Sequence, residues 1–354
     1  MFSPNVPQPA TRELEVRRPR GIARDQLHKI RIHPYHPLIT STYLRPISAM
    51  ANIEKTFRSY TSDQGKNYAQ NRLDYHQDLY NLIVAHHTST GGQLDALVDV
   101  GCGPGNVASN LSKHFARTTG LDPSEGMVAT ARSLNSGPAT DSGKLRFEVS
   151  TAEDLGSNLS PPIADSSVDM IVAATAAHWF DMPAFWRSAA RVLKPGGSVA
   201  IWGSANLRTS PGTPNAEAIQ ARVDQFEAEI RPYFLPGNVL TRGLYKDLRL
   251  PWTVEPAAEG FDEKTFFRRD WDTTEKFLAL GVPEIDMGVF ERMLGTMSPV
   301  TRWREDHPDA IGEKDVVRLF RRDIERLLRE AGVEEGKEKV KGSAQGFLLM
   351  VKKI

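Results

Sequence analysis

Three alternating glycines are the residues of this chain best placed to hold a ligand. Gly101, Gly103 and Gly105 follow an apolar run that contains the acid Asp99. Because glycine has no Cβ, such a loop turns tightly and lets a ligand lie against the main chain. A strand that runs into a glycine loop at the start of a helix is typical of nucleotide-binding sites. The stretch 97–106 is therefore predicted to bind a nucleotide or a nucleoside.

The spacing of the loop distinguishes between two ligands. In the dinucleotide fingerprint the glycines are spaced G-x-G-x-x-G, and a pyrophosphate lies on the helix N-terminus. Here the third glycine comes one residue early, and Asn106 stands where the fingerprint has glycine. A carboxylate at Asp99 would repel a pyrophosphate but suits an ammonium group. S-adenosylmethionine has no phosphate and carries an ammonium group, so the residues favour it over NAD.

Further acids follow the next two apolar stretches. Asp122 ends the run 116–122, where a carboxylate accepts hydrogen bonds from ribose hydroxyls in NAD and S-adenosylmethionine alike. After the run 145–149, an acid can accept a hydrogen bond from an adenine amino group, and Glu153 and Asp154 are the candidates. Asp122 alone supports a nucleoside and not a choice between the two cofactors.

Alternating strands and helices must position these acids and glycines. Strands are predicted at 97–100, 116–122, 145–149, 168–174 and 198–202. Pro123 and Glu125 are typical of the first turn of a helix. A Pro-Gly-Gly turn at 195–197 precedes the fifth strand.

Together these motifs resemble those of the class I S-adenosylmethionine-dependent methyltransferases of the type 11-like kind, over about residues 55–205. The jointly specific motifs are V-D-V-G-C-G-x-G at 98–105, L-D-P-S-x-x-M at 121–127 and L-K-P-G-G at 193–197. The resemblance implies an α/β fold: a Rossmann-like, doubly wound, seven-stranded sheet with an antiparallel last strand and a helical cap insertion. It also implies S-adenosylmethionine as cofactor. The cofactor-binding residues would be Tyr68, Asp99, Gly101, Gly103, Gly105, Asp122, Met127, Ala152, Glu153, Asp154 and Ala174.

Within this class the chain resembles the fungal group that includes the trans-aconitate methyltransferases. That group carries the segment Y-x-x-x-R-P-x-Y-P-x-x-L-Y, which residues 68–80 match except at Leu73 and His76, where the group has proline. The A-A-H-W-F-D motif after the fourth strand is matched at 176–181. The two departures imply an altered access to the cofactor site, which bears on the acceptor more than on the cofactor.

His178 is the candidate catalytic base. Methyl transfer from a sulfonium is an in-line displacement, so the main task is to hold the acceptor atom behind the methyl group. A base is needed only where the acceptor carries a proton. His178 follows the fourth predicted strand, at the edge where open α/β sheets bind ligands. A purely structural histidine is the alternative.

A carboxylate acceptor needs cations in place of a base. Arg72 is the first candidate. Further candidates are Arg268, Arg269, Arg302 and Arg304. Trp179 and Trp252 are candidates for the walls of an apolar or aromatic substrate pocket, with ordinary packing as the alternative.

Composition narrows the classes of partner. The chain has 354 residues, 40% of them hydrophobic, with a formal net charge of zero, which argues against a nucleic-acid partner. No apolar run approaches the roughly 18 residues that span a bilayer. Cys102 is the single cysteine, which excludes an intrachain disulfide. The histidines lack the spacing of a zinc site, so no metal is expected. We therefore expect a cytoplasmic protein that acts on a small molecule.

Four regions are predicted along the chain. Residues 1–50 are an N-terminal extension, 51–205 the S-adenosylmethionine-binding core, 206–260 the cap insertion, and 261–354 the part that completes the sheet and the substrate pocket. The extension carries eight basic and three acidic residues without apolar periodicity, which predicts disorder. A start at Met50 and a transit peptide are the alternatives.

Apolar spacing predicts the remaining elements. They are helices at 216–230, 272–281 and 313–332, and strands at 264–271 and 346–351. The segments 206–260 and 282–312 would form the acceptor site, yet neither contains a motif with a chemical meaning.

Several functions are consistent with these residues. The leading hypothesis is methylation of a carboxylate or hydroxyl oxygen of a small molecule, such as a lipophilic fungal secondary metabolite. A trans-aconitate-type carboxyl methyltransferase of primary metabolism is the alternative within the class. From other classes, an NAD(P)-dependent oxidoreductase is disfavoured by Asp99 and the early third glycine. An inactive methyltransferase-like binding protein is disfavoured by the intact set of cofactor motifs.

Overall fold

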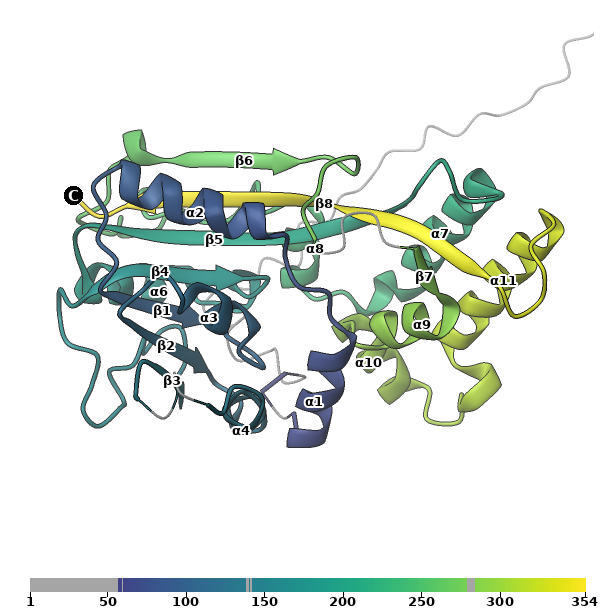
Figure 1. Cartoon of the computed structure of the whole chain (residues 1–354), viewed down its shortest axis with the longest axis horizontal. Helices are drawn as coiled ribbons and strands as arrows, with labels where there is room; N and C mark the ends of the chain where they lie inside the picture. Colours follow the sequence, from purple (N-terminus) through teal and green to yellow (C-terminus); the bar gives the residue numbers. More distant parts are fainter. Residues whose placement is uncertain (1–56, 59, 138–139, 141, 279–283) are drawn as a thin grey trace, which may run out of the picture. The chain divides into compact units, whose positions relative to one another are not determined.

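The apolar stretches of the chain form one mixed sheet (Figure 1). Its strands are β1 (Ala96–Val100), β2 (Arg117–Asp122), β3 (Leu145–Val149), β4 (Val168–Ala174), β5 (Leu193–Thr209), β6 (Phe267–Trp271), β7 (Glu284–Asp286) and β8 (Lys339–Lys352). The order is β3-β2-β1-β4-β5-β8-β6, parallel from β3 to β5, with β8 antiparallel to both of its neighbours. This confirms the predicted α/β fold with an antiparallel last strand. The short β7, which was not predicted, pairs with β8 outside this path.

The computed structural model describes residues 57–354 apart from 59, 138–139, 141 and 279–283. The predicted extension 1–50 lies outside this range. The α-helices are α1 (Ser62–Asn71), α2 (Gln77–Ser89), α3 (Asn106–Leu111), α4 (Glu125–Leu134), α6 (Met182–Val192), α7 (Ala216–Ile230), α8 (Pro236–Arg242), α9 (Met287–Gly295), α10 (Ser298–Asp306) and α11 (Val316–Glu330). Within the described residues there are also 3-10 turns, η2 (Ala177–Trp179), η3 (Arg231–Tyr233), η4 (Glu263–Thr265) and η5 (Gly312–Lys314).

Helices cover both faces of the sheet because successive side chains of a buried parallel strand point to opposite faces. Val98 and Ile171 pack on one face in a core that includes Trp186 of α6. Their strand neighbours Leu97 and Met170 pack on the other face, in a second core with side chains of α2 and α3. The sheet is therefore doubly wound, as the sequence predicts.

β5 and β8 are much longer than their predicted strands. They pair from Ser198 opposite Lys352 to Thr209 opposite Gly342, which extends the two strands as a ribbon beyond the parallel strands. The extensions are rich in small and polar residues, so main-chain pairing holds them and apolar periodicity did not reveal them.

A third core lies at the far end of this ribbon, among α7, α9, α10 and α11, which we call the helical module (Figure 1). Phe226 of α7 stacks on Phe320 of α11 with ring centroids 4.5 Å apart. Phe290 of α9 completes the cluster at 5.6 Å from Phe320. α9, α10 and α11, from the region 261–354 that was predicted to complete the sheet, therefore pack with α7 from the predicted cap 206–260.

The segment 206–260 divides between two cores. α7 belongs to the helical module, whereas Tyr245, Leu248 and Val254 are buried in the core that covers one face of the sheet. The segment that follows α8 is thus part of the main body, next to α6.

The predicted helix at 272–281 is wrong over its described part. Residues 272–278 form turns and an isolated bridge between Leu278 and Tyr75. Asp272 accepts hydrogen bonds from the main chain and the hydroxyl of Thr274, at 2.7 and 2.6 Å. An Asp side chain that bonds a nearby N–H in this way offers the backbone an alternative to the helix.

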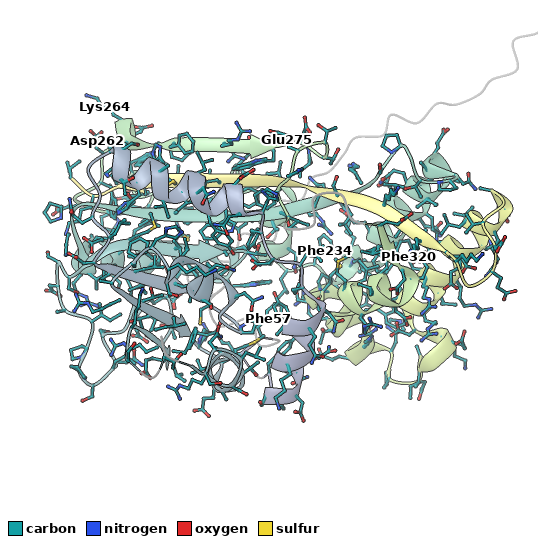
Figure 2. The ribbon with its side chains drawn as sticks, in the orientation of Figure 1. Phe57, Phe234, Asp262, Lys264, Glu275 and Phe320 are labelled. Atoms are coloured by element: carbon teal, nitrogen blue, oxygen red, sulfur yellow. The ribbon has the colours of Figure 1, made fainter. Side chains whose placement is uncertain are left out.

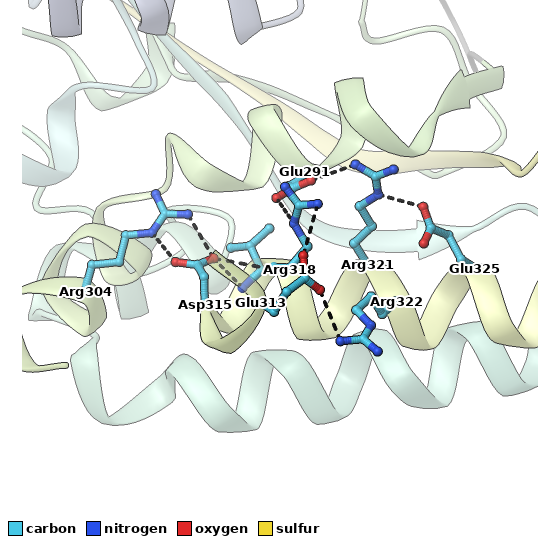
Figure 3. A network of polar contacts seen from close by, with 9 residues as sticks. Glu291, Arg304, Glu313, Asp315, Arg318, Arg321, Arg322 and Glu325 are labelled. Atoms are coloured by element: carbon cyan, nitrogen blue, oxygen red, sulfur yellow. Dashed lines mark hydrogen bonds and ion pairs between the residues drawn. The ribbon is translucent and has the colours of Figure 1, made fainter. Parts of the chain in front are cut away.

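Ion pairs tie the helices of the module together (Figure 3). Glu291 of α9 accepts hydrogen bonds from Arg318 and Arg321 of α11, both at 2.8 Å. The side chain of Glu291 is only 18% exposed, whereas Glu313, which pairs with Arg322 in the same network, is 66% exposed. The buried pair should therefore contribute more to stability than the exposed one.

We expect Glu291→Gln to lower the free energy of unfolding by about 1–2 kcal/mol, because two half-buried guanidinium groups lose their charged partner. Urea unfolding followed by circular dichroism measures the change. Glu313→Gln is the matched control and should change stability by no more than about 0.5 kcal/mol. Equal effects of the two substitutions would show that the burial of Glu291 is unimportant.

Candidate active site

A cavity of about 360 Å³ opens where the carboxyl ends of the parallel strands meet. Asp99 of β1, Asp122 of β2 and Ala174 of β4 line one half of it. α1 and the helical module supply the other half. Figure 2 shows Phe57 near α1 and Phe234 beside the helical module, and both line the cavity.

The glycine loop joins β1 to α3 in a conformation that requires glycine. Gly101, Gly103 and Gly105 have φ angles of 68°, 53° and 89°, in the left-handed region. A Cβ on Gly101 would lie 2.6 Å from the Cβ of Ala176, so this residue also permits a close approach between β1 and the end of β4. Cys102, between Gly101 and Gly103, is buried, and burial raises the pKa of its thiol well above its usual range.

Asp122 fixes this loop from the neighbouring strand. Its two carboxylate oxygens accept hydrogen bonds from the main-chain N–H groups of Gly103 and Ser124, both at 2.9 Å. Burial raises the pKa of Asp122 to about 6, and these hydrogen bonds partly offset the effect. The acid that the sequence assigns to a ribose therefore also holds the loop in shape.

Asp99 is the unusual group of the site. The residue is 1% exposed, and neither carboxylate oxygen has a hydrogen-bond partner among the described residues. Burial raises the pKa of Asp99 to about 8; the nearby main-chain amide of Ala108 lowers it, and the negative charge of Asp122 raises it further. A buried carboxylate without a partner is unfavourable. The site therefore fits a ligand that brings an ammonium group to Asp99.

Most of the other predicted cofactor residues also line the cavity. Tyr68, Met127, Ala152, Glu153 and Ala174 are among its walls. Asp154 is not: its exposed side chain accepts a hydrogen bond from Thr151 at 2.9 Å. Of the two adjacent acids that the sequence could not separate, Glu153 lies in the cavity.

Two of the predicted substrate residues, Arg72 and Trp179, line the other half of the cavity. The guanidinium of Arg72 lies 5.0 Å from the ring centre of Tyr68, and its buried Nε has no hydrogen-bond partner among the residues that the structure describes. Trp179 lies 6.4 Å from Phe57, ring centre to ring centre. Trp252 lies outside the cavity lining and packs against Phe266.

The four other candidate arginines are outside the cavity lining. Arg268 and Arg269 pair with Asp270 and Glu275, Arg304 pairs with Asp315, and Arg302 donates to the main-chain oxygen of Tyr233 and to Asn238. α10 lines the cavity through Ser298 and Pro299 at its start, whereas Arg302 and Arg304 are engaged elsewhere.

The helical module and α8 supply residues that the sequence analysis missed. Arg242 lines the cavity, forms an ion pair with Glu227 at 3.3 Å and lies over Phe234. Met293 and Met297 are also part of the lining. No motif marks these residues, and only the folding of the β5–β8 ribbon brings them to the strand ends.

His178 lies on η2, after β4, and lines the cavity. Its Nδ1 is hydrogen-bonded to the hydroxyl of Tyr245. Burial, together with the like charge of Arg72, lowers the pKa of the His178 imidazole to about 3. The ring is therefore neutral at ordinary pH, and its Nε2 makes no hydrogen bond to a described residue.

The described residues also limit other kinds of site. No group of three or more His, Cys, Asp or Glu among them is arranged to hold a metal ion. None of the helices between residues 57 and 354 for which the structure gives a position is long and apolar enough to cross a bilayer.

Comparison with known proteins identifies the class of this site. A family model described as a methyltransferase domain matches residues 98–201, from β1 to β5. A Dictyostelium discoideum protein that carries the name of a methyltransferase is 25% identical to this chain over 255 residues. The match covers 70% of this chain and 89% of the relative. A Saccharomyces cerevisiae protein named as a probable S-adenosylmethionine-dependent methyltransferase is 31% identical over 39% of this chain and 45% of its own. The 27-O-demethylrifamycin SV methyltransferase of Amycolatopsis mediterranei is 32% identical over 39% of this chain and 52% of its own.

A solved structure shares the fold over most of its length. The structure of an Anaeromyxobacter dehalogenans protein that carries the name of a type II methyltransferase superposes with a TM-score of 0.54 at 22% identity. The match covers 80% of this chain and 97% of that protein. This structure shows the shared fold. Residues 98–201 are the core of a methyltransferase domain whose cofactor is S-adenosylmethionine. The alternative of an NAD(P)-dependent oxidoreductase is thereby without support. The yeast and Amycolatopsis relatives are matched over only about half of their length, so they do not establish the acceptor.

We expect the affinity for S-adenosylmethionine to rise between pH 6 and pH 8, by up to about tenfold per unit, because the cofactor's ammonium requires an ionised Asp99 that is protonated below its raised pKa of about 8. Binding should release a proton in this range. Isothermal titration calorimetry in two buffers of different ionisation enthalpy measures both effects.

Asp99→Asn should weaken binding and remove the pH dependence. Asp154→Asn is the matched control, since this exposed acid lies one residue beyond the cavity lining, and it should leave both unchanged. A dissociation constant for the unsubstituted protein that is independent of pH would contradict the role of Asp99.

Proposed function

We propose that this protein transfers a methyl group from S-adenosylmethionine to a carboxylate or hydroxyl oxygen of a small molecule. The observation that carries this proposal is the presence in one cavity of two charged groups with buried atoms that lack partners in the described part of the chain. Asp99 and Arg72 both line the cavity, and neither the carboxylate oxygens of Asp99 nor Nε of Arg72 has a hydrogen-bond partner among the described residues. A cationic methyl donor and an anionic or oxygen-bearing acceptor would each meet the opposite charge.

The side chains that line the acceptor half favour a partly apolar acceptor. This half is surrounded by Phe57 before α1, Trp179 of η2, Phe234 after η3, Met293 of α9 and Met297 at the start of α10. Aromatic and methionine side chains suit a flat or lipophilic acceptor. The name of the Amycolatopsis relative indicates an O-demethylated natural product as acceptor. These features favour a secondary metabolite, and a fungal pathway and a cytoplasmic location stay predictions from the sequence.

The mechanism we propose depends on position more than on acid–base chemistry. S-adenosylmethionine supplies an electrophilic methyl group and leaves as a neutral thioether. Arg72 would hold an acceptor carboxylate, which needs no base. For a hydroxyl acceptor, Nε2 of His178 would take the proton as the new oxygen–carbon bond forms. A neutral imidazole with a lowered pKa is a weak base, so this transfer would come late in the step.

Two arginines give some support to a second acceptor class, a small polycarboxylate as in the trans-aconitate methyltransferases. Arg72 and Arg242 could bind two carboxylates of one molecule. The aromatic walls are less favourable to so polar an acceptor, which makes this the second candidate.

Incubation with methyl-labelled S-adenosylmethionine tests the proposal. The acceptors are two matched series, aromatic and aliphatic carboxylic acids and the corresponding hydroxyl compounds, with a small tricarboxylate added. We expect label in a methyl ester or methyl ether of an aromatic acceptor, identified by mass spectrometry. Arg72→Met should raise the KM of a carboxylate acceptor by about 10- to 100-fold with S-adenosylmethionine affinity unchanged. Arg269→Met, on β6 outside the cavity lining, is the control. Label only on carbon, or in none of these oxygen acceptors, would contradict O-methylation.

His178→Gln separates the two acceptor chemistries. With a hydroxyl acceptor, loss of the base should lower kcat by about 100-fold or more, whereas methyl transfer to a carboxylate should lose far less. Stopped assays with one acceptor of each kind, at saturating S-adenosylmethionine, measure the difference. An unchanged kcat for the hydroxyl acceptor would remove His178 from the mechanism.

A further inference from the structure

The turn that carries His178 is held from outside by one segment of the chain, α8 with residues 243–245. The hydroxyl of Tyr245 accepts a hydrogen bond from the main-chain N–H of His178 at 3.2 Å and is hydrogen-bonded to Nδ1 of the same residue. Thr241, on α8, lies close enough to lower the pKa of the Tyr245 phenol, and its own hydroxyl donates to the main-chain oxygen of Gly237 at 3.0 Å. One phenol therefore contacts both the backbone and the ring of His178.

The backbone at Tyr245 is shaped for this contact. Leu244 and Tyr245 have φ angles of 54° and 53°, which non-glycine residues adopt rarely and which the surroundings must enforce. Arg268 of β6 donates to the carbonyl oxygen of Leu244 at 2.9 Å, and the N–H of Tyr245 donates to Leu240 at 3.1 Å. These contacts hold two consecutive left-handed residues in place.

The core fixes the other end of the same side chain. Tyr245 is 1% exposed, and its ring lies 4.6 Å from Phe347 of β8, centre to centre. α8 approaches the turn so closely that a Cβ on Gly237 would lie 2.6 Å from the carbonyl oxygen of His178. Neither the phenol nor the turn has room to move independently.

We propose that Tyr245 is a positioning residue that fixes the imidazole of His178 in one orientation and in one tautomer, in which Nδ1–H donates to the phenol oxygen and the unprotonated Nε2 is directed to the acceptor. Nδ1 is engaged by the phenol, so Nε2 is the ring nitrogen left for a ligand in the cavity that His178 lines. Arg72 is the charged group that faces the ring, and it favours the neutral form. The catalytic consequence rests on the proposed function, whereas the structural role does not.

Nitrogen NMR of the histidine side chains tests the positioning directly. Full-length protein with 15N-labelled histidine is saturated with S-adenosylhomocysteine, and His178→Gln identifies the His178 signals among those of the nine histidines. We expect a protonated Nδ1 and an unprotonated Nε2, with separate shifts that do not change between pH 5.5 and pH 8, and the opposite assignment would contradict the proposal. In Tyr245→Phe the two shifts should move toward a common average, because the ring then exchanges between tautomers.

Tyr245→Phe keeps the ring that packs against Phe347, and its unfolding temperature verifies that the fold is retained. Tyr233→Phe is the matched control, since its hydroxyl donates to the exposed Asp306 at 2.9 Å, and it should leave the His178 signals unchanged. Shifts in Tyr245→Phe identical to those of the unsubstituted protein would overturn the proposal.

Kinetics separate this proposal from the proposed function. For a hydroxyl acceptor, Tyr245→Phe should lower kcat by about tenfold without changing the KM of S-adenosylmethionine. If His178→Gln lowers kcat but Tyr245→Phe does not, the positioning role is wrong and the base stands. If neither changes kcat, the base is wrong, and the NMR shifts alone decide whether Tyr245 fixes the ring.

Discussion

The burial of two carboxylates at adjacent strand ends is the constraint on which the site depends. Asp99 and Asp122 are both buried, and the charge of one raises the pKa of the other. Asp122 is compensated by two main-chain N–H groups of the loops around it. Asp99 has no such partner among the described residues. Burial thus raises the pKa of Asp99, and a cationic ligand such as S-adenosylmethionine would favour its ionised form.

The acceptor half depends on a different element, the long ribbon of β5 and β8. Eleven residue pairs join these strands, from Ser198 to Thr209 on β5. The ribbon holds the helical module close enough for Met293 and Met297 to face the strand ends, while α8 returns Arg242 to the cavity. A rigid antiparallel pair is well suited to this task, because each residue is fixed by its neighbour across the ribbon. The two halves of the cavity therefore have separate structural supports.

Some elements and site residues could be predicted from the sequence, and others could not. The strands from β1 to β4 and the glycine loop were predictable, since each is a local apolar run bounded by turn residues. The helix expected at 272–281 failed where Asp272 offered the backbone competing hydrogen bonds. Asp154 and Glu153 are adjacent and chemically alike, and only the course of the chain after β3 determines that Glu153 lines the cavity. Tyr245 carried no motif, yet it contacts His178 across 67 positions of sequence.

The sequence by itself determined the fold class, the methyl donor and the acids and glycines that suit it, because those residues lie within short motifs whose spacing fixes their local geometry. The tertiary structure decided what the acceptor meets. Arg242, Met293, Phe234 and Tyr245 are brought to the strand ends by strand pairing and core packing over long separations. Such contacts leave no periodic pattern in the chain, since each residue is chosen by its neighbours in space and not by its neighbours in sequence.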